Sequence, residues 1–246
     1  MSSPSLREPG TLIVTPTYNE RGNLPRHVAA IRRAAPDAHV LIVDDASPDG
    51  TGELAESLAA EDDHVHVMHR PGKLGLGTAY VQAFTHGLAQ GYERIVSMDA
   101  DLSHDAKYLP DFFRALDAGA DVVIGSRNIA GGSVQGWGVR RHVLSKGGSL
   151  YARTVLGLGV HDLTSGYKAF SRRALEAIDL PAVRSTGYAF MIEMTYRAVC
   201  HGMRVTEVPI VFVDRVMGQS KMSRKIFLEA VGVVWRLRFD SVRGTL

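Results

Sequence analysis

The sequence contains very little cysteine, which excludes several classes of protein. Cys200 is the only cysteine among 246 residues, so neither an internal disulfide nor a cysteine-rich zinc site can form. It lies in an apolar helical stretch, residues 188–201, where we expect a buried, unreactive thiol in a reduced compartment. The composition is not typical of collagen-like or disordered chains, so we expect an ordinary globular protein.

Long apolar runs are absent as well. No segment approaches the roughly 18 to 20 uninterrupted apolar residues of a membrane-spanning helix, and residues 1–10 lack the apolar centre of a signal peptide. We therefore expect that the chain does not cross a membrane by itself. The net charge is only +2, and nucleic acid is not among the partners that we expect. From residue 215 onward, seven Lys and Arg stand against two Asp and Glu, so a basic tail follows a slightly acidic body.

Short apolar runs alternate with helical patterns over the first half of the chain. This alternation predicts an α/β fold in which helices cover both faces of a mostly parallel sheet. No repeat or long linker interrupts residues 1–246, so we expect a single domain. The expected strands are 12–15, 40–43, 65–68, 95–98 and 122–124, and the expected helices are 24–34, 52–60, 77–90 and 107–118. Later elements are a helix at 142–156, an extended run at 205–213 and a terminal helix at about 222–239.

The apolar run 95–98 ends in two carboxylates, Asp99 and Asp101. Side chains of extended backbone repeat every second residue, so both acids should point the same way. Hard divalent cations such as Mg²⁺ or Mn²⁺ bind carboxylate oxygens and keep positions open for substrate phosphates. Ser103 is a candidate for a further oxygen ligand. The alternative for these residues alone is a solvated turn in which Asp105 caps the next helix.

Two other motif interpretations fail. The alternating oxygen residues at 99–105 imitate the start of an EF-hand loop, but His104 replaces its turn glycine and Pro110 its bidentate glutamate. The Gly-x-Gly at 75–77 is not a dinucleotide fingerprint, because Tyr80 occupies the third glycine position.

Five motifs occur in an order and spacing that together resemble one known family. They are PTYNE at 16–20, VDDASPDGT at 43–51, DADLSH at 99–104, GSR at 125–127 and DLTSGY at 162–167. The chain resembles, over nearly its whole length, the dolichol-phosphate (polyprenol-phosphate) mannose synthases. These are inverting glycosyltransferases of family 2 with the GT-A fold, a Rossmann-like nucleotide-diphospho-sugar transferase domain.

The resemblance implies an activity and a set of ligands. It implies inverting, metal-dependent transfer of mannose from GDP-mannose to a polyprenyl or dolichyl monophosphate. Asp99 and Asp101 would bind Mg²⁺ or Mn²⁺ on the diphosphate, with Ser103 as a third ligand. Further residues implied to bind the nucleotide sugar are Pro16, Tyr18, Glu20, Val43 in the base pocket, Asp45 and Ala100.

The resemblance also assigns the basic residues. Arg127 would bind the diphosphate, and Arg141 with Ser145 would bind the acceptor phosphate. Arg215 and Lys221 would reach the donor phosphates from a mobile loop. A phosphate monoester has a second pKa of about 6, so the acceptor is ionised near pH 7 and needs no general base. The basic side chains and the metal ion therefore become the main catalytic groups, and we expect Asp101, Arg127 and Arg141 to be catalytic.

The terminal helix has an apolar face and cationic flanks, so it is suited to a membrane interface. The alternative is a helix packed on the sheet with Trp235 in the core. We expect a peripheral position on the cytoplasmic face of a membrane and a separate membrane-anchoring subunit. The apolar residues of the helix are Ile226, Phe227, Ala230, Val233, Val234 and Leu237.

Two rival functions stay open at the level of sequence. A polyprenyl-phosphate glucosyltransferase that uses UDP-glucose would share the early motifs. A non-catalytic nucleotide-sugar-binding subunit would keep the acids at the strand ends but would not need the basic residues Arg127, Arg141, Arg215 and Lys221. Asp162, Thr164, Ser165 and Glu193 are polar residues for which we expect structural roles.

Overall fold

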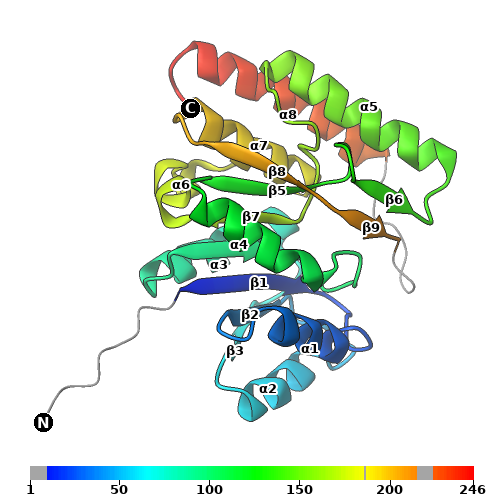
Figure 1. The fold of residues 1–246 in the computed structure, drawn as a ribbon, viewed down its shortest axis with the longest axis vertical. Coiled ribbons are helices and arrows are strands. Elements are labelled where there is room, and N and C mark those ends of the chain that lie inside the picture. The colour runs from blue at the N-terminus through cyan, green and yellow to red at the C-terminus, as the bar shows by residue number, and fades with distance from the viewer. Residues whose placement is uncertain (1–9, 186, 215–223) are drawn as a thin grey trace, which may run out of the picture.

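A mixed sheet with helices on both faces forms the molecule (Figure 1). The computed structural model describes residues 10–185, 187–214 and 224–246. Within these residues the sheet has the strand order β3-β2-β1-β4-β7-β5-β8, and only β7 runs antiparallel to its neighbours. The α/β fold class predicted from sequence is confirmed. Its strands are β1 (Thr11–Thr17), β2 (His39–Asp44), β3 (Val65–His69), β4 (Arg94–Ser97), β5 (Val122–Ser126), β7 (Lys168–Ser171) and β8 (Val205–Pro209).

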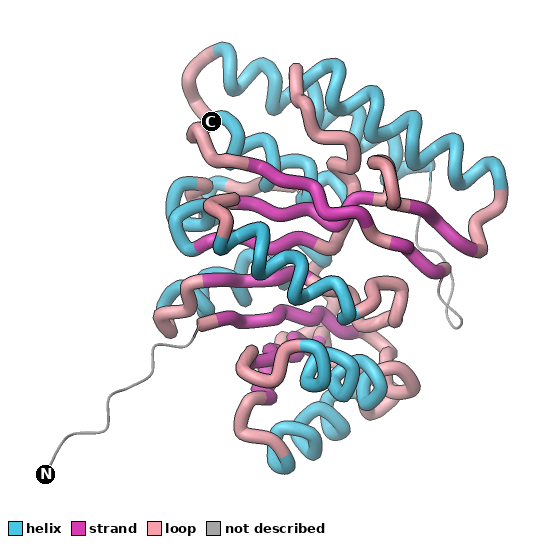
Figure 2. Tube along the Cα trace, in the orientation of Figure 1, coloured by secondary structure: helices cyan, strands magenta, loops and turns pink. Residues whose placement is uncertain are grey.

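Helices alternate with these strands, and most lie close to their predicted positions (Figure 2). A second, two-stranded sheet pairs β6 (Ser133–Gln135) with β9 (Val211–Val213) in parallel. The α-helices are α1 (Leu24–Ala34), α2 (Thr51–Glu61), α3 (Leu76–Ala89), α4 (Leu109–Asp117), α5 (Val139–Leu156), α6 (Arg172–Ala177), α7 (Tyr188–Cys200) and α8 (Arg224–Val242). Short 3-10 turns are η1 (Ala106–Tyr108) and η2 (Leu180–Ala182).

Alternate residues of each strand divide the core between the two faces of the sheet. Leu12 and Val14 of β1 belong to a cluster with α3, α6, α7 and α8, whereas Ile13 belongs to a cluster with α1, α2 and α4. Both clusters are almost fully buried. Helices on both faces explain why the strands are apolar at consecutive positions, as the sequence pattern indicated.

Strand β7 was missed by sequence analysis. It is four residues long and begins with a charged residue, Lys168, so no apolar run marks it. In the structure Lys168 is fully buried, and its Nζ donates to the carbonyl oxygens of Leu163 and Met191 and to Thr195 Oγ1. These acceptors compensate the buried ammonium group.

Two detailed predictions are wrong. Strand β4 ends at Ser97, so Asp99 and Asp101 do not continue an extended strand; they lie in the turn that follows, where Leu102 has a φ of 62°. Cys200 is exposed, because it is the last residue of α7 and turns away from the core. Of the two interpretations left open for the terminal helix, the one that places Trp235 in the core is not supported, because Trp235 is 47% exposed.

Helices α5 and α8 pack side by side along one end of the molecule (Figure 1). Among the α8 side chains that the structure describes, from Val231 onward, Val233, Val234 and Leu237 are buried. Tyr151 Oη of α5 donates to the carbonyl oxygen of Val231 at 3.2 Å. In the part of the chain that the structure describes, no helix is both long and apolar enough to span a bilayer.

Candidate active site

Three strand-end loops meet at one edge of the sheet. Strands β2 and β4 flank β1 in parallel, so the loops after β1, β2 and β4 are neighbours. Each loop contains one residue with a positive φ: Asn19 at 60°, Ala46 at 53° and Leu102 at 62°. Residues other than glycine rarely adopt such a backbone conformation. Strained backbone of this kind persists only where the surrounding structure holds it, and it is concentrated at functional sites. This edge is therefore the candidate active site.

The loop after β2 is built around its two acids. Asp44 accepts hydrogen bonds from Thr17 Oγ1 and from the backbone and hydroxyl of Ser47, which ties β1 to β2. Asp45 forms an ion pair with Arg70, with Nη1 to Oδ1 at 2.6 Å. Burial raises the pKa of Asp45, although the charge of Arg70 acts in the opposite direction. Arg70 holds Asp45 in place, and sequence analysis did not identify it.

The other residues predicted to bind the nucleoside surround this loop. Tyr18 lies under Lys73, whose Nζ is 4.4 Å from the ring centroid, and Glu20 accepts a hydrogen bond from Asn23 Nδ2. Pro16 is in β1, where it is paired in register with Val43. Val43 is 0% exposed and packs in the core, so its side chain lies beneath this edge rather than on its surface. A role for Val43 in a base pocket stays a prediction.

The two acids after β4 lie in a polar setting, in which Asp101 is buried and Asp99 is partly buried. Tyr80 Oη donates to Asp99 Oδ1 at 3.3 Å, and Asp101 Oδ1 accepts from the backbone N–H of Ser103 at 3.0 Å. Burial, followed by the charge of Asp99, raises the pKa of Tyr80 well above its usual value, so the phenol stays protonated and donates. Burial lowers the pKa of His104, although Asp99 and Asp101 act in the opposite direction.

The donor atoms here fit a hard divalent cation. Asp99 and Asp101 supply carboxylate oxygens, and the buried Ser103 Oγ has no hydrogen-bond partner among the described residues. A buried hydroxyl without a partner is costly, so a ligand that binds it is favoured. Ala100 lies between the acids and is 2% exposed. Within the described ranges no group of three or more His, Cys, Asp or Glu is arranged to hold a metal ion. A cation here would therefore take its remaining ligands from substrate and water.

Arg127 is fixed by a buried carboxylate. Its Nε and Nη2 donate to the two oxygens of Asp162, each at 2.7 Å, and its backbone N–H donates to Oδ2 at 2.9 Å. Thr164 Oγ1 accepts a further bond from Nη2. Although burial alone would raise it, the bonds and charge of Arg127 hold the pKa of Asp162 below its usual value. Asp162 and Thr164 therefore orient Arg127.

Trp137 brings two arginines together. The guanidinium carbon of Arg141 lies 4.2 Å from the Trp137 ring centroid, and that of Arg127 lies at 5.5 Å. Cation–π attraction offsets part of the repulsion between neighbouring guanidinium groups. Arg141 Nη1 also pairs with Asp214 Oδ1 at 2.8 Å. Sequence analysis did not identify Trp137 or Asp214; a tryptophan between glycines in a polar loop was the available signal for the first.

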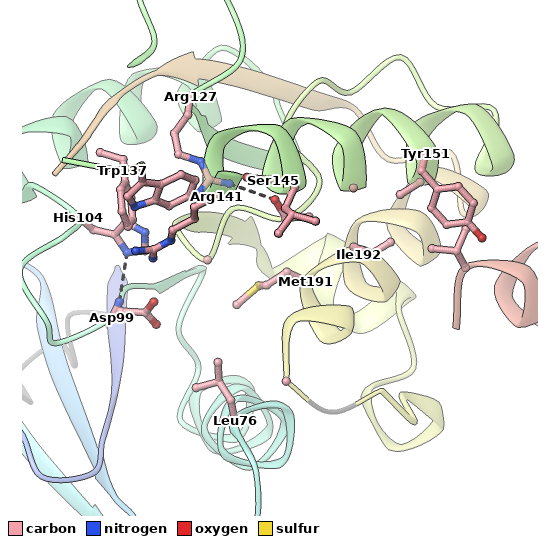
Figure 3. A pocket seen from close by; sticks show the side chains of 18 of the residues that line it. Leu76, Asp99, His104, Arg127, Trp137, Arg141, Ser145, Tyr151, Met191 and Ile192 are labelled. Carbon is pink, nitrogen blue, oxygen red and sulfur yellow. Dashed lines mark hydrogen bonds between the residues drawn. The ribbon is translucent and has the colours of Figure 1, made fainter. Parts of the chain in front are cut away.

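One cavity brings many of the predicted residues together (Figure 3). Asp99, Asp101, Arg127, Arg141 and Ser145 all line it. Its other walls are mainly apolar and come from α3, α5, α7 and α8. The cavity does not include the residues predicted to bind the nucleoside, which lie along the adjoining edge of the sheet. Arg215 and Lys221 are outside the described residues.

The fold and the site define a class of protein. Paired acids beyond a parallel strand, beside fixed arginines at the carboxyl edge of the sheet, are the arrangement of an enzyme that handles a nucleotide-diphospho-sugar. Comparison with known proteins identifies the family. Residues 12–179 match the model for glycosyl transferase family 2, so the chain belongs to that family of glycosyltransferases.

Two curated relatives match nearly the whole chain. The polyprenol monophosphomannose synthase of Mycolicibacterium smegmatis is 52% identical over 96% of this chain and 91% of its own length. The undecaprenyl-phosphate mannosyltransferase of Micrococcus luteus is 48% identical over 96% of this chain and 98% of its own length. The family resemblance predicted from the five motifs is confirmed.

Solved structures agree on the fold. Glucosyl-3-phosphoglycerate synthase of Mycobacterium tuberculosis superposes with a TM-score of 0.68 at 16% identity, over 94% of this chain and 80% of that one. A mannosyltransferase of Pyrobaculum calidifontis superposes with a TM-score of 0.60 at 20% identity, over 96% of this chain and 65% of that one. At this level of identity the likeness concerns the fold alone.

Proposed function

We propose that this glycosyltransferase moves mannose from GDP-mannose to a polyprenyl monophosphate, with inversion at the sugar, to give a lipid-linked mannosyl donor. The observation that carries the proposal is the single cavity lined by Asp99, Asp101, Arg127 and Arg141. Two relatives whose names give polyprenol or undecaprenyl phosphate chemistry with mannose, at 52% and 48% identity, support the choice of sugar and acceptor.

The residues of the cavity suit two anionic substrates. The acceptor monoester, already ionised at neutral pH, needs cations rather than a base. Arg141 and Ser145 lie one helical turn apart on the same face of α5, so a guanidinium and a hydroxyl are available to donate to its phosphate oxygens. Arg127, held by Asp162, would stabilise the negative charge that develops on the departing diphosphate. Asp45, Tyr18 and the rest of the adjoining edge would bind the nucleoside.

A divalent cation, Mg²⁺ or Mn²⁺, belongs to the same proposal. Asp99 and Asp101 would hold it, with Ser103 Oγ as a further oxygen donor. When bound, such an ion supplies positive charge that stabilises the diphosphate as a leaving group. The mannosyltransferase of Pyrobaculum calidifontis was solved in complex with GDP-Man and Mn²⁺, which supports this choice.

A peripheral position on a membrane is the third part of the proposal. Exposed apolar residues of α8 recur at helical spacing and share one face, and α5 carries a similar face beside it. Cationic residues flank both, which suits an anionic lipid surface. The cytoplasmic side and a separate anchoring subunit stay predictions. The apolar residues are Trp235, Phe239 and Val242 of α8 and Val139, Val143 and Leu150 of α5.

The decisive experiment supplies labelled GDP-mannose and UDP-glucose side by side, with Mg²⁺ or Mn²⁺ and a polyprenyl phosphate. We expect mannosyl-phospho-lipid from GDP-mannose only. Asp101→Asn should abolish product and weaken Mn²⁺ binding, measured by calorimetry, while circular dichroism stays unchanged. Asp105→Asn is the matched control, because Asp105 is an exposed acid of the same loop that caps η1, and asparagine caps equally well. Product from UDP-glucose alone, or equal activity of the two variants, would contradict the proposal.

Vesicle binding tests the membrane part separately. Trp235→Ser with Phe239→Ser removes exposed aromatic surface from α8 without touching its buried face, so folding should be unaffected. We expect at least tenfold weaker co-sedimentation with anionic vesicles, since burial of two aromatic side chains supplies much of the affinity of an interfacial helix. Unchanged binding would place the membrane contact elsewhere.

A further inference from the structure

Arg127 depends for its orientation on a short segment, residues 161–164. Asp162 and Thr164 of this segment accept the hydrogen bonds of the Arg127 side chain. That side chain lines the cavity next to Trp137 (Figure 3). All four residues of the segment are described, and they lie between α5 and β7, outside the helices and strands. Because the hydrogen bonds of a helix or sheet do not fix the segment, its position depends on side chains that reach it from other elements.

Glu207 of β8 fixes the start of the segment. Its Oε2 accepts the backbone N–H of His161 at 2.9 Å, and its Oε1 accepts that of Asp162 at 3.0 Å. The ring Nδ1 of His161 also lies 2.9 Å from Oε2. The side chain of Glu207 is only 12% exposed, and hydrogen bonds to a shielded carboxylate are stronger than those to a solvated one. Both oxygens of Glu207 are thus engaged by the segment.

The strands that carry Glu207 and Arg127 are neighbours. β8 pairs in parallel with β5, and Glu207 stands opposite Ile124 in the register. Arg127 follows directly after Ser126, the last residue of β5. Asp162 therefore bridges two adjacent strands: its carboxylate accepts from Arg127, and its backbone N–H donates to Glu207. Groups held by packed strands are positioned more accurately than groups held by loops alone.

Lys168 of β7 holds the middle of the segment. Its Nζ donates to the carbonyl oxygen of Leu163 at 3.0 Å and to that of Met191 in α7 at 2.7 Å. Burial lowers the pKa of Lys168 to about 7, although the charges of Asp162 and Glu207 act in the opposite direction. The segment is therefore tied to α7 as well, so loss of a Glu207 contact would loosen the segment without releasing it.

We infer that Glu207 is a positioning residue for Arg127: by fixing the backbone of residues 161 and 162, it keeps the guanidinium aimed at the place of the departing diphosphate. The inference rests on the proposed function, which assigns that diphosphate to Arg127. Glu207 is not one of the described residues that line the cavity, so it acts through the segment rather than on a substrate. Displacement of a catalytic group by about 1 Å can slow a reaction about a hundredfold, so a loosened segment should have a measurable effect.

Glu207→Gln tests the inference with little change of shape. The amide keeps one oxygen acceptor but turns an NH₂ group towards the second backbone N–H, so one of the two contacts is lost. Glu176→Gln is the matched control, because this exposed glutamate pairs with Arg172 of its own helix, α6. Circular dichroism should show that both variants are folded.

The kinetic effect should be confined to the transfer step. We expect Glu207→Gln to lower kcat at least about tenfold and to leave KM for GDP-mannose unchanged, because Arg127 acts on charge that develops during transfer. GDP already carries that charge on its terminal phosphate. Its affinity, measured by calorimetry with Mn²⁺, should therefore fall about tenfold. Glu176→Gln should match the wild type in both measurements.

A double-mutant cycle with Arg127→Lys separates positioning from a general structural role. Lysine cannot make the two parallel bonds to Asp162, so the orientation that Glu207 supports is already lost in that variant. We therefore expect Glu207→Gln to weaken GDP binding by less than about twofold in the Arg127→Lys background, compared with about tenfold in the wild type.

Three results would overturn the inference. Glu207→Gln keeps the kcat and GDP affinity of the wild type, or its effect is equally large in the Arg127→Lys background, or it loses the circular dichroism of the fold, which would make Glu207 a structural residue. The titration separates this inference from the proposed function, because it needs no acceptor. If the wild type forms no mannosyl lipid, titration with GDP and with UDP still decides: a loss of affinity that depends on Arg127 supports the positioning role, and equal affinities of Glu207→Gln and Glu176→Gln, or no binding, refute it.

Discussion

The buried pair of Arg127 and Asp162 should contribute strongly to both stability and activity. Asp162 is fully buried, and three hydrogen bonds from Arg127 converge on its carboxylate. Asp162→Ala would leave the guanidinium, whose side chain is only 8% exposed, without its partner. Removing one member of a buried ion pair costs about 3–5 kcal/mol. For a protein of this size that lowers Tm by roughly 6–20 °C.

Urea unfolding followed by circular dichroism measures this loss. The control is Glu176→Ala, which removes the ion-pair partner of Arg172 on α6. The side chain of Arg172 is 30% exposed and that of Glu176 is 54% exposed. A surface pair at this spacing contributes only about 0.3–0.5 kcal/mol. Replacing both buried partners by apolar residues, Arg127→Met with Asp162→Leu, should recover most of the stability but none of the turnover. Equal losses for Asp162→Ala and Glu176→Ala would refute the reasoning.

Two further predictions concern Trp137 and His27. Trp137→Ala should lower kcat about tenfold, which corresponds to about 1.4 kcal/mol, because Arg141 loses the ring 4.2 Å away. Steady-state kinetics checks this, and Trp137→Phe should restore most of the rate; no recovery would argue against the cation–π contact. Burial lowers the pKa of His27 from 6.5 to about 4, so the folded state keeps it neutral while the unfolded chain takes up a proton. Stability should therefore fall by about 3 kcal/mol as pH drops from 6.5 towards 4. Urea unfolding of wild type and His27→Gln across this range measures the effect, and an identical pH slope would contradict it.

The order of strands and helices was predictable because its signals are local. Apolar runs of three or four residues, separated by amphipathic stretches, indicated five strands of the main sheet, and the extended run 205–213 indicated β8, so six of its seven strands within the described residues were predicted. Boundaries shifted by one to three residues, as at β1, which continues through Pro16 to Thr17. Strand β7 escaped because it is short and begins with Lys168, so no apolar run marks it; in the structure three acceptors satisfy the buried amino group of that lysine.

The chemistry of the site was also largely visible in sequence. Acids placed directly after apolar runs must lie at the carboxyl edge of a parallel sheet, whatever the details of packing. Asp45, Asp99 and Asp101 follow such runs, and the structure places all three at that edge. The assumption of extended backbone through Asp101 failed, because the chain turns after Ser97 and reaches a left-handed conformation at Leu102.

What the sequence alone determined is the set of reactive groups and the edge of the sheet on which they stand, since both follow from local periodicity. Only the tertiary structure decided which groups hold one another. Arg127 meets Asp162 across 35 positions, and Arg141 meets Asp214 across 73. The apolar walls of the cavity come from α3, α5, α7 and α8, which are far apart in the sequence. Such contacts depend on how distant elements pack, and no local pattern encodes that arrangement.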